Sequence, residues 1–174
     1  MSKLSEPITS ADHVAGNPNA SVTLVEYGDY QCPYCGAAHP IVKEILARFG
    51  NDIRFVFRNF PLTEIHPHAF HAATAAEFAN LHGKFWEMHD TIYEHQSALA
   101  DSDLSAYGHR LGLDPVDLVE GLDDPKLEGR VQHDFMTGVR SGVNGTPSFF
   151  IDGIRHDGAW DFDHLSQALQ AAIR

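Results

Sequence analysis

The sequence contains only two cysteines among its 174 residues. Both lie within the stretch DYQCPYCGAAHP, as Cys32 and Cys35. So few cysteines exclude a scaffold held together by several disulfides, and they supply only half of a four-thiolate zinc site. The pair does not identify a compartment, since a single reactive dithiol can function in a reducing or an oxidising environment.

Basic residues are also scarce. The chain has 12 Lys and Arg against 24 Asp and Glu, which gives a formal net charge of −12. Such a surface repels a phosphate backbone or an anionic membrane surface, so nucleic acid is not an expected partner. The remaining composition, 43% hydrophobic and 21% charged, is typical of a soluble globular protein with a core. The length suits one domain, or one domain that carries an insertion.

Long apolar runs are absent. No segment approaches the roughly 18 apolar residues that a membrane helix needs, so we expect no membrane insertion. Near the amino terminus, Glu6, Pro7 and Asp12 interrupt any apolar segment of a secretory signal. We therefore expect a cytoplasmic protein, the alternative being a periplasmic protein whose leader has been removed.

The apolar pattern predicts an α/β core interrupted by helices. Runs rich in β-branched and aromatic residues predict strands, and apolar positions spaced three and four residues apart predict helices. Asp152-Gly153 is typical of a tight hairpin turn, and Asp161 is typical of a helix cap. We expect strands at 21–27, 53–60 and within 145–156, an active-site helix ending near 50, a helical region at about 66–143 and a last helix from 161.

The CPYC segment falls where the first strand gives way to a helix. Pro33 suits the first helical turn, where its missing N–H costs nothing. Residues at i and i+3 on a helix have Cβ atoms about 5 to 6 Å apart, so the two sulfurs can reach bonding distance. The helix dipole favours a thiolate on Cys32, which we expect to be exposed and nucleophilic. Cys35, one turn inward, is expected to be shielded and to resolve a mixed disulfide.

Two other interpretations of the cysteine pair stay open. One is a disulfide that only stabilises, although closing so short a loop stabilises a chain by only about 2 kcal/mol. The other is half of a zinc site.

Glu26 lies in the first predicted strand, six positions before Cys32, and shares a face with Val22 and Leu24. A strand covered on both sides would bury this carboxylate and raise its pKa. Glu26 could then carry the proton that Cys35 must lose when it attacks. The alternative is a strand-end glutamate that reaches solvent.

The motifs together resemble the thioredoxin-fold oxidoreductases, and more narrowly the DsbA-like proteins, in which a helical domain interrupts a thioredoxin core. The resemblance rests on YGDYQCPYC, FRNFPL, GKFWEMHD and GTPSFFIDG, with Pro40 eight positions after Cys32. It covers nearly the whole chain beyond about residue 20. It implies a thioredoxin-like domain formed by 1–61 and 144–174, with a polar lead-in at 1–20, and an inserted helical domain at 62–143.

The resemblance also implies roles for individual residues. Cys32 attacks, Cys35 resolves, Glu26 relays a proton, and Pro147 follows a cis peptide bond beside the thiols. In such proteins the peptide groups around that proline bind an extended substrate backbone. The expected substrate-binding residues are Pro33, Tyr34, Thr146 and Pro147.

One departure concerns the residues between the cysteines. The strongest oxidases of this family have Pro-His there, whereas this chain has Pro-Tyr, as in glutaredoxins. A histidine can stabilise the reduced thiolate, and Tyr34 lacks that charge, so strong oxidising power is not expected.

Our first hypothesis is an enzyme that exchanges disulfides with protein or peptide thiols. The redox-active Cys32–Cys35 disulfide would accept the electrons and the dithiol would donate them. We expect no other cofactor, no metal and an unidentified redox partner. The alternatives are a glutaredoxin-like enzyme for small thiols or peroxides and a non-catalytic binding module on a thioredoxin scaffold. The oligomeric state is left open.

Histidines are numerous, with 12 in the chain. His68 and His71 have a helical spacing that could hold a metal, but no HExxH motif accompanies them, so a polar helix face is expected. His39 follows the CPYC segment and is expected to be solvated.

Overall fold

The computed structural model describes residues 1–173. They form two compact units. The sheet unit comprises Met1–Gly28, Ala37–Arg58 and the residues from Met136 onward. The helical unit comprises Asp29–Gly36 and Asn59–Phe135. The domain ranges expected from the sequence stay a prediction, and the CPYC segment belongs to the helical unit.

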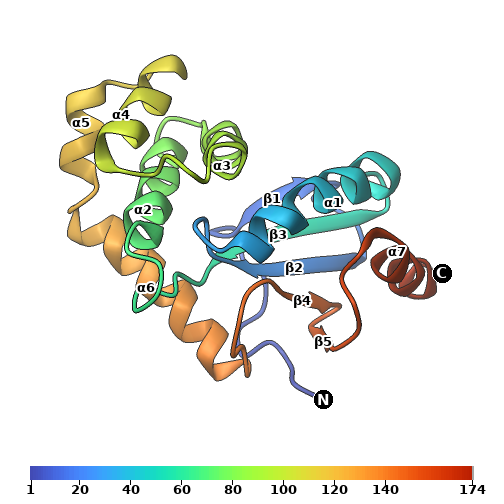
Figure 1. Ribbon diagram of the computed structural model, residues 1–174. Helices are drawn as coiled ribbons and strands as arrows, with labels where there is room; N and C mark the ends of the chain where they lie inside the picture. Colours follow the sequence, from blue (N-terminus) through green and yellow to red (C-terminus); the bar gives the residue numbers. More distant parts are fainter. Residues whose placement is uncertain (174) are drawn as a thin grey trace. The chain divides into compact units, whose positions relative to one another are not determined.

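The sheet has five strands in the order β1-β3-β2-β4-β5 (Figure 1). Its two central strands are buried along almost their whole length, which explains their nearly continuous apolar sequence. The pairs β1–β3, β2–β4 and β4–β5 are antiparallel. The strands are β1 His13–Gly16, β2 Val22–Gly28, β3 Ile53–Asn59, β4 Ser148–Ile151 and β5 Ile154–His156.

Two helices contribute apolar faces to the core of the sheet unit. Helix α1, Pro33–Phe49, begins in the helical unit and continues into the sheet unit, where Ile45 is fully buried. Helix α7, Phe162–Ala172, packs against β4 with Leu165 and Leu169 fully buried. Asp161 caps α7 by accepting a hydrogen bond from the His164 amide at 3.1 Å, as the sequence predicted.

The first strand was not predicted, because residues 1–20 were expected to be a polar lead-in. Strand β1 pairs instead with β3, from His13 opposite Phe57 to Gly16 opposite Arg54. Next to it, the buried Arg58 guanidinium forms an ion pair with Asp12 through Nε at 2.9 Å and Nη2 at 3.0 Å. The segment is ordered by partners far away in the sequence, which local composition does not reveal.

The hairpin between β4 and β5 turns at Asp152 and Gly153. Both have positive φ angles, 48° and 78°, as a type I′ turn requires. The predicted Asp-Gly turn is therefore confirmed.

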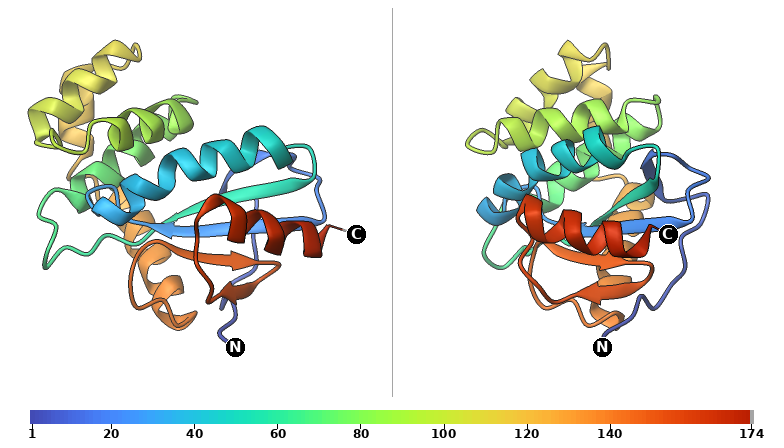
Figure 2. Two further views of the ribbon diagram at one scale, coloured as in Figure 1. Left: turned by 45° about the vertical axis from the view of Figure 1, so that its right-hand side comes forward. Right: turned by 90° about the vertical axis from the view of Figure 1, so that its right-hand side faces the viewer.

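The helical unit is formed by short helices with small residues at their contacts. Helix α2 packs against α3, α4 and α5, and its alanines at 72, 73, 75, 76 and 79 are buried, which allows close approach. Asp114 caps α5 by accepting from the amides of Val116 and Asp117. The predicted helical region is confirmed as α2 Ala69–Asn80, α3 Phe85–Glu94, α4 Asp101–Arg110, α5 Pro115–Gly121 and α6 Pro125–Arg140, the last of which ends in the sheet unit (Figure 2).

Within residues 1–173, no helix combines the length and the apolar character that crossing a lipid bilayer demands.

Candidate active site at the CPYC turn

The two cysteines lie at the start of α1, where the Gly36 amide donates to the Cys32 carbonyl at 3.0 Å. Cys35 is fully buried, as predicted, but Cys32 is also buried, with 3% of its surface exposed. The expectation of an exposed Cys32 was therefore wrong. The exposed tip of the turn is formed by Pro33 and by Tyr34, which is 67% exposed.

The peptide group of Cys32 is hydrogen-bonded to neighbouring residues of the helical unit. Its amide donates to the Asp29 carbonyl at 3.1 Å and to Asp29 Oδ1 at 3.2 Å. Its carbonyl accepts from Gln96 Nε2 at 2.9 Å. Asp29 and Tyr30, which precede the turn, are each 1% exposed. The turn thus holds Cys32 inward while Tyr34 faces solvent.

Asp29 is a residue that the sequence analysis missed. Its Oδ1 also accepts from the Gln31 amide at 2.8 Å, and its own amide donates to Cys35 Sγ at 3.5 Å. A hydrogen bond to sulfur favours the thiolate form, which is the form in which Cys35 attacks. The usable signal was an aspartate in the turn before a helix, a residue type that accepts from amides two or three positions onward.

Gln96, which follows α3, was missed as well. In addition to Cys32, its Nε2 donates to the Tyr30 carbonyl at 2.8 Å. Gly36 makes room for this side chain, since a Cβ atom built there would approach Gln96 Oε1 far inside contact distance. No sequence signal identifies Gln96, because 64 positions separate it from Cys32.

Tyr30 anchors the same segment to α3. Its hydroxyl lies 2.8 Å from His89 Nδ1, and its ring centroid lies 4.8 Å from that of Tyr93. These contacts account for the position of residues 29–36 in the helical unit.

Glu26 is placed in the sheet unit, in β2, with Phe149 of β4 as its register partner. Its side chain is buried, with the residue 2% exposed, and Oε1 has no hydrogen-bond partner among the described residues. Burial raises the pKa of Glu26 from 4.5 to about 8. The alternative in which Glu26 reaches solvent was therefore wrong, and its role as a proton carrier stays a prediction.

Thr146 and Pro147 directly precede β4 in the sheet unit. The peptide bond between them is cis, as the resemblance implied. The next residue, Ser148, pairs with Tyr27 of β2, so this segment enters the sheet beside the carboxyl end of β2. The substrate-binding roles of Thr146 and Pro147, like those of Pro33 and Tyr34, stay predictions.

His39 and His71 differ in their surroundings. His39 is buried, with 7% exposed, so the expectation of a solvated side chain was wrong. His71 Nδ1 lies 2.7 Å from Asp101 Oδ1, and its Nε2 lies 3.3 Å from Asp123 Oδ1. Burial alone would lower the pKa of His71, but the hydrogen bond to Asp101 and the charges of both carboxylates raise it.

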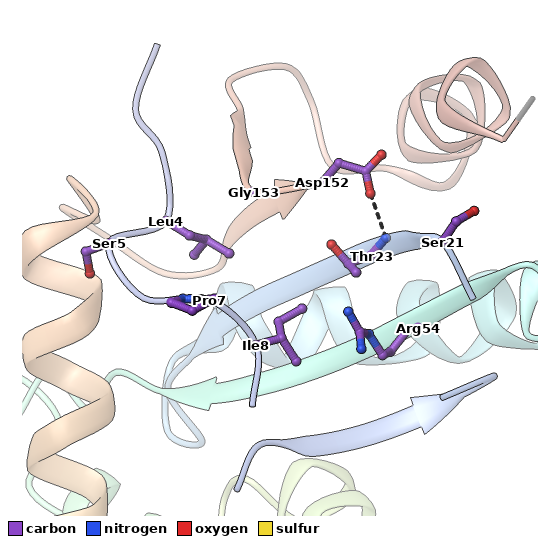
Figure 3. Close-up of a pocket in the computed structure, with 9 residues that line it drawn as sticks. All are labelled: Leu4, Ser5, Pro7, Ile8, Ser21, Thr23, Arg54, Asp152 and Gly153. Carbon is purple, nitrogen blue, oxygen red and sulfur yellow. Dashed lines mark hydrogen bonds between the residues drawn. The ribbon is translucent and has the colours of Figure 1, made fainter. Parts of the chain in front are cut away.

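The sheet unit also contains a cavity of about 560 Å³. Figure 3 shows that Leu4 and Ile8 of the N-terminal segment line it together with Thr23 of β2 and Arg54 of β3, and that Asp152 accepts from the Thr23 amide, at 2.8 Å. Neither cysteine lines this cavity.

Comparison with known proteins agrees with this architecture. The thioredoxin family model matches residues 9–171. BdbD from Bacillus subtilis, in its oxidised form, superposes on this chain with a TM-score of 0.87 at 21% identity over 99% of this chain and 98% of that one. A thioredoxin-like oxidoreductase from Silicibacter pomeroyi superposes with a TM-score of 0.84 at 27% identity over 94% of this chain and 93% of that one.

Among curated proteins, the chain is 48% identical over 162 residues to the Na(+)/H(+) antiporter NhaA 1 of Salinispora arenicola. The match covers 93% of this chain but 25% of that protein. The chain thus spans about a quarter of the length of such curated relatives.

The five-stranded sheet and the helix that begins at the two cysteines are the arrangement of a thioredoxin fold. The chain belongs to the thioredoxin family. The α/β fold expected from the sequence, a thioredoxin fold with inserted helices as in DsbA-like proteins, is confirmed.

Proposed function

We propose that this chain catalyses dithiol-disulfide exchange with protein substrates through Cys32 and Cys35. The observation that carries the proposal is the cysteine pair at the start of a helix. The amide and the carbonyl of Cys32 are both hydrogen-bonded, and the sulfur of Cys35 accepts a hydrogen bond. Backbone and side-chain bonds of this kind hold two reacting sulfurs in one geometry, which favours intramolecular attack.

In the reducing direction, the Cys32 thiolate attacks one sulfur of a substrate disulfide. A bond forms between Cys32 and that sulfur, the substrate disulfide breaks, and one substrate thiolate leaves. The helix start favours the thiolate of Cys32 electrostatically.

In the second step, Cys35 loses its proton and its sulfur attacks Cys32 Sγ. The Cys32–Cys35 disulfide forms, the mixed disulfide breaks, and the second substrate thiolate leaves and is protonated. The substrate has gained two electrons and the enzyme has lost two. We propose Glu26 as the proton carrier, because a carboxyl group with a pKa of about 8 changes protonation state near neutral pH.

The electron store in this proposal is the cysteine pair, with no further cofactor. Its direction of transfer is set by the redox partner and the potential of the compartment. Pro33, Tyr34, Thr146 and Pro147 are the proposed substrate-binding residues. In the longer antiporter relatives, we propose that disulfide exchange is the activity of the matched quarter.

The proposal is tested by reduction of insulin disulfides with dithiothreitol as electron donor, followed by oxidative refolding of a reduced protein. Wild-type protein should accelerate at least one of the two reactions, and Cys32→Ser should accelerate neither. Equal rates for both forms would overturn the proposal. Faster turnover of a glutathione mixed disulfide than of any protein disulfide would favour the glutaredoxin-like alternative instead.

A further inference from the structure

The Asp29 carboxylate is buried completely and has four hydrogen-bonding neighbours, all within the helical unit. Oδ1 accepts from the amides of Gln31 at 2.8 Å and Cys32 at 3.2 Å. Oδ2 accepts from the Leu62 amide at 2.8 Å and lies 2.7 Å from His66 Nδ1. One oxygen thus faces the CPYC turn, and the other faces the loop that follows β3.

The loop is joined to the same segment by a second bond. The His68 amide donates to Gln31 Oε1 at 2.7 Å, and the His66 amide donates to the Leu62 carbonyl at 2.9 Å, which folds the loop into a turn. His66 is consequently held against Asp29, and its side chain is only 16% exposed. The ionisable groups in contact with Asp29 are His66 at the carboxylate and Cys35 at the amide.

The position of this carboxylate has an electrostatic consequence for the thiol. Oδ1 accepts from the Cys32 amide at 3.2 Å, so its charge lies near the Cys32 side chain. Two unit charges about 6 Å apart interact by roughly 2 pKa units at an effective dielectric constant of about 20. A carboxylate there opposes a Cys32 thiolate, whereas a protonated imidazole beside it offsets that charge.

We propose that Asp29 and His66 form a positioning pair for Cys32, in which the carboxylate fixes the turn and the imidazole sets how much negative charge the thiolate faces. The proposal deepens the proposed function, since it assigns regulation of the same nucleophile. Asp29 contacts the backbone amide of Cys32, and the pair acts through the geometry and charge around that residue.

The test is the pKa of Cys32, measured by alkylation rate against pH in the full chain with Cys35→Ser as background. Asp29→Asn keeps an acceptor for the turn and removes the charge, so it should lower the pKa of Cys32 by about one unit. His66→Gln removes the imidazole that contacts Oδ2 and should raise the pKa of Cys32 by up to about one unit. Glu64→Gln, an exposed carboxylate of the same loop, should leave it unchanged.

Opposite shifts in the two variants support the pair, whereas an unchanged pKa in both overturns it, even if both variants lose stability. Should Asp29→Asn fail to fold, His66→Gln decides alone. The measurement does not depend on exchange activity. A wild-type chain that is inactive on every disulfide would overturn the proposed function, while the two shifts would still decide the role of the pair.

Discussion

The side-chain amide of Gln96 donates to the carbonyl oxygen of Cys32 at 2.9 Å. The same carbonyl accepts the first hydrogen bond of α1, from the Gly36 amide at 3.0 Å. A single oxygen therefore joins the start of the helix to a side chain 64 positions away. Because Gln96 occupies the space next to Gly36, its position requires that residue 36 has no side chain.

Substituting Gly36 should have opposite effects in two backgrounds. In the wild-type chain, Gly36→Ala displaces Gln96 and breaks its bonds to Tyr30 and Cys32, at a cost of about 1 to 2 kcal/mol in the free energy of unfolding. In a Gln96→Ala chain the space is empty. There the better helix propensity of alanine should stabilise by about 0.5 to 1 kcal/mol.

Urea denaturation of the four chains in this double-mutant cycle measures both effects. The cycle isolates the contact because each single substitution removes the same interaction. If Gly36→Ala destabilises both backgrounds equally, Gln96 does not hold the turn.

Replacing Glu26 should change how stability depends on pH. The pKa of Glu26 is raised to about 8 by burial, so between pH 4.5 and 8 the unfolded chain releases this proton while the folded chain keeps it. The wild-type protein therefore loses stability from this group as pH rises through that window. Glu26→Gln removes this pH dependence. The free energy of unfolding that the variant gains over the wild type should grow from near zero at pH 4.5 to on the order of 3 kcal/mol at pH 7.

Denaturation of both proteins at pH 5 and pH 8 checks the Glu26 prediction. Glu87→Gln, an exposed carboxylate of α3, is the matched control and should show no such trend. A constant difference between wild type and Glu26→Gln across the pH range would mean that Glu26 is ionised in the folded protein.

The sequence was sufficient to predict most of the fold, for local reasons. The buried strands, the Asp152-Gly153 turn and the Asp161 cap each follow from residues within a few positions of one another. Strand β1 could not be predicted, because its pairing with β3 and the ion pair of Arg58 with Asp12 join segments about 40 residues apart.

In the candidate site, too, only the features that depend on neighbouring residues could be predicted. Cys32, Cys35 and the burial of Glu26 follow from spacing and strand pattern. The burial of Cys32 does not, because it depends on Asp29, Gln96 and the tyrosine anchor at Tyr30 acting from different segments. Helix position indicates where a thiol lies along the chain, whereas its exposure depends on tertiary contacts.

His71 should contribute stability that disappears at alkaline pH. Its pKa is raised above the ordinary value near 6.5 by Asp101 and Asp123 against the opposing effect of burial. The contribution is complete below about pH 6.5 and is lost as pH rises through the folded-state value. Since all three side chains are at least a third exposed, we expect less than about 1 kcal/mol, and less still in high salt.

Thermal unfolding of wild type and His71→Gln at pH 6 and pH 9 measures this contribution. The difference in unfolding temperature between the two proteins should be smaller at the higher pH. His82→Gln, whose ring contacts Phe78 rather than a carboxylate, is the control. A constant difference in unfolding temperature would show that the pKa of His71 is the same in the folded and the unfolded chain.

The order of attack by the two cysteines can be determined by trapping. In Cys35→Ser the Cys32 thiolate can still capture a substrate disulfide, but no second sulfur is present to displace it. We expect this variant to accumulate a covalent adduct at a stoichiometry of one, visible on a non-reducing gel and as a mass shift, and released by dithiothreitol. Cys32→Ser leaves only the fully buried Cys35 and should accumulate at least tenfold less. Equal trapping by both variants would contradict the assignment of Cys32 as nucleophile, because the fully buried Cys35 would then be as reactive as Cys32.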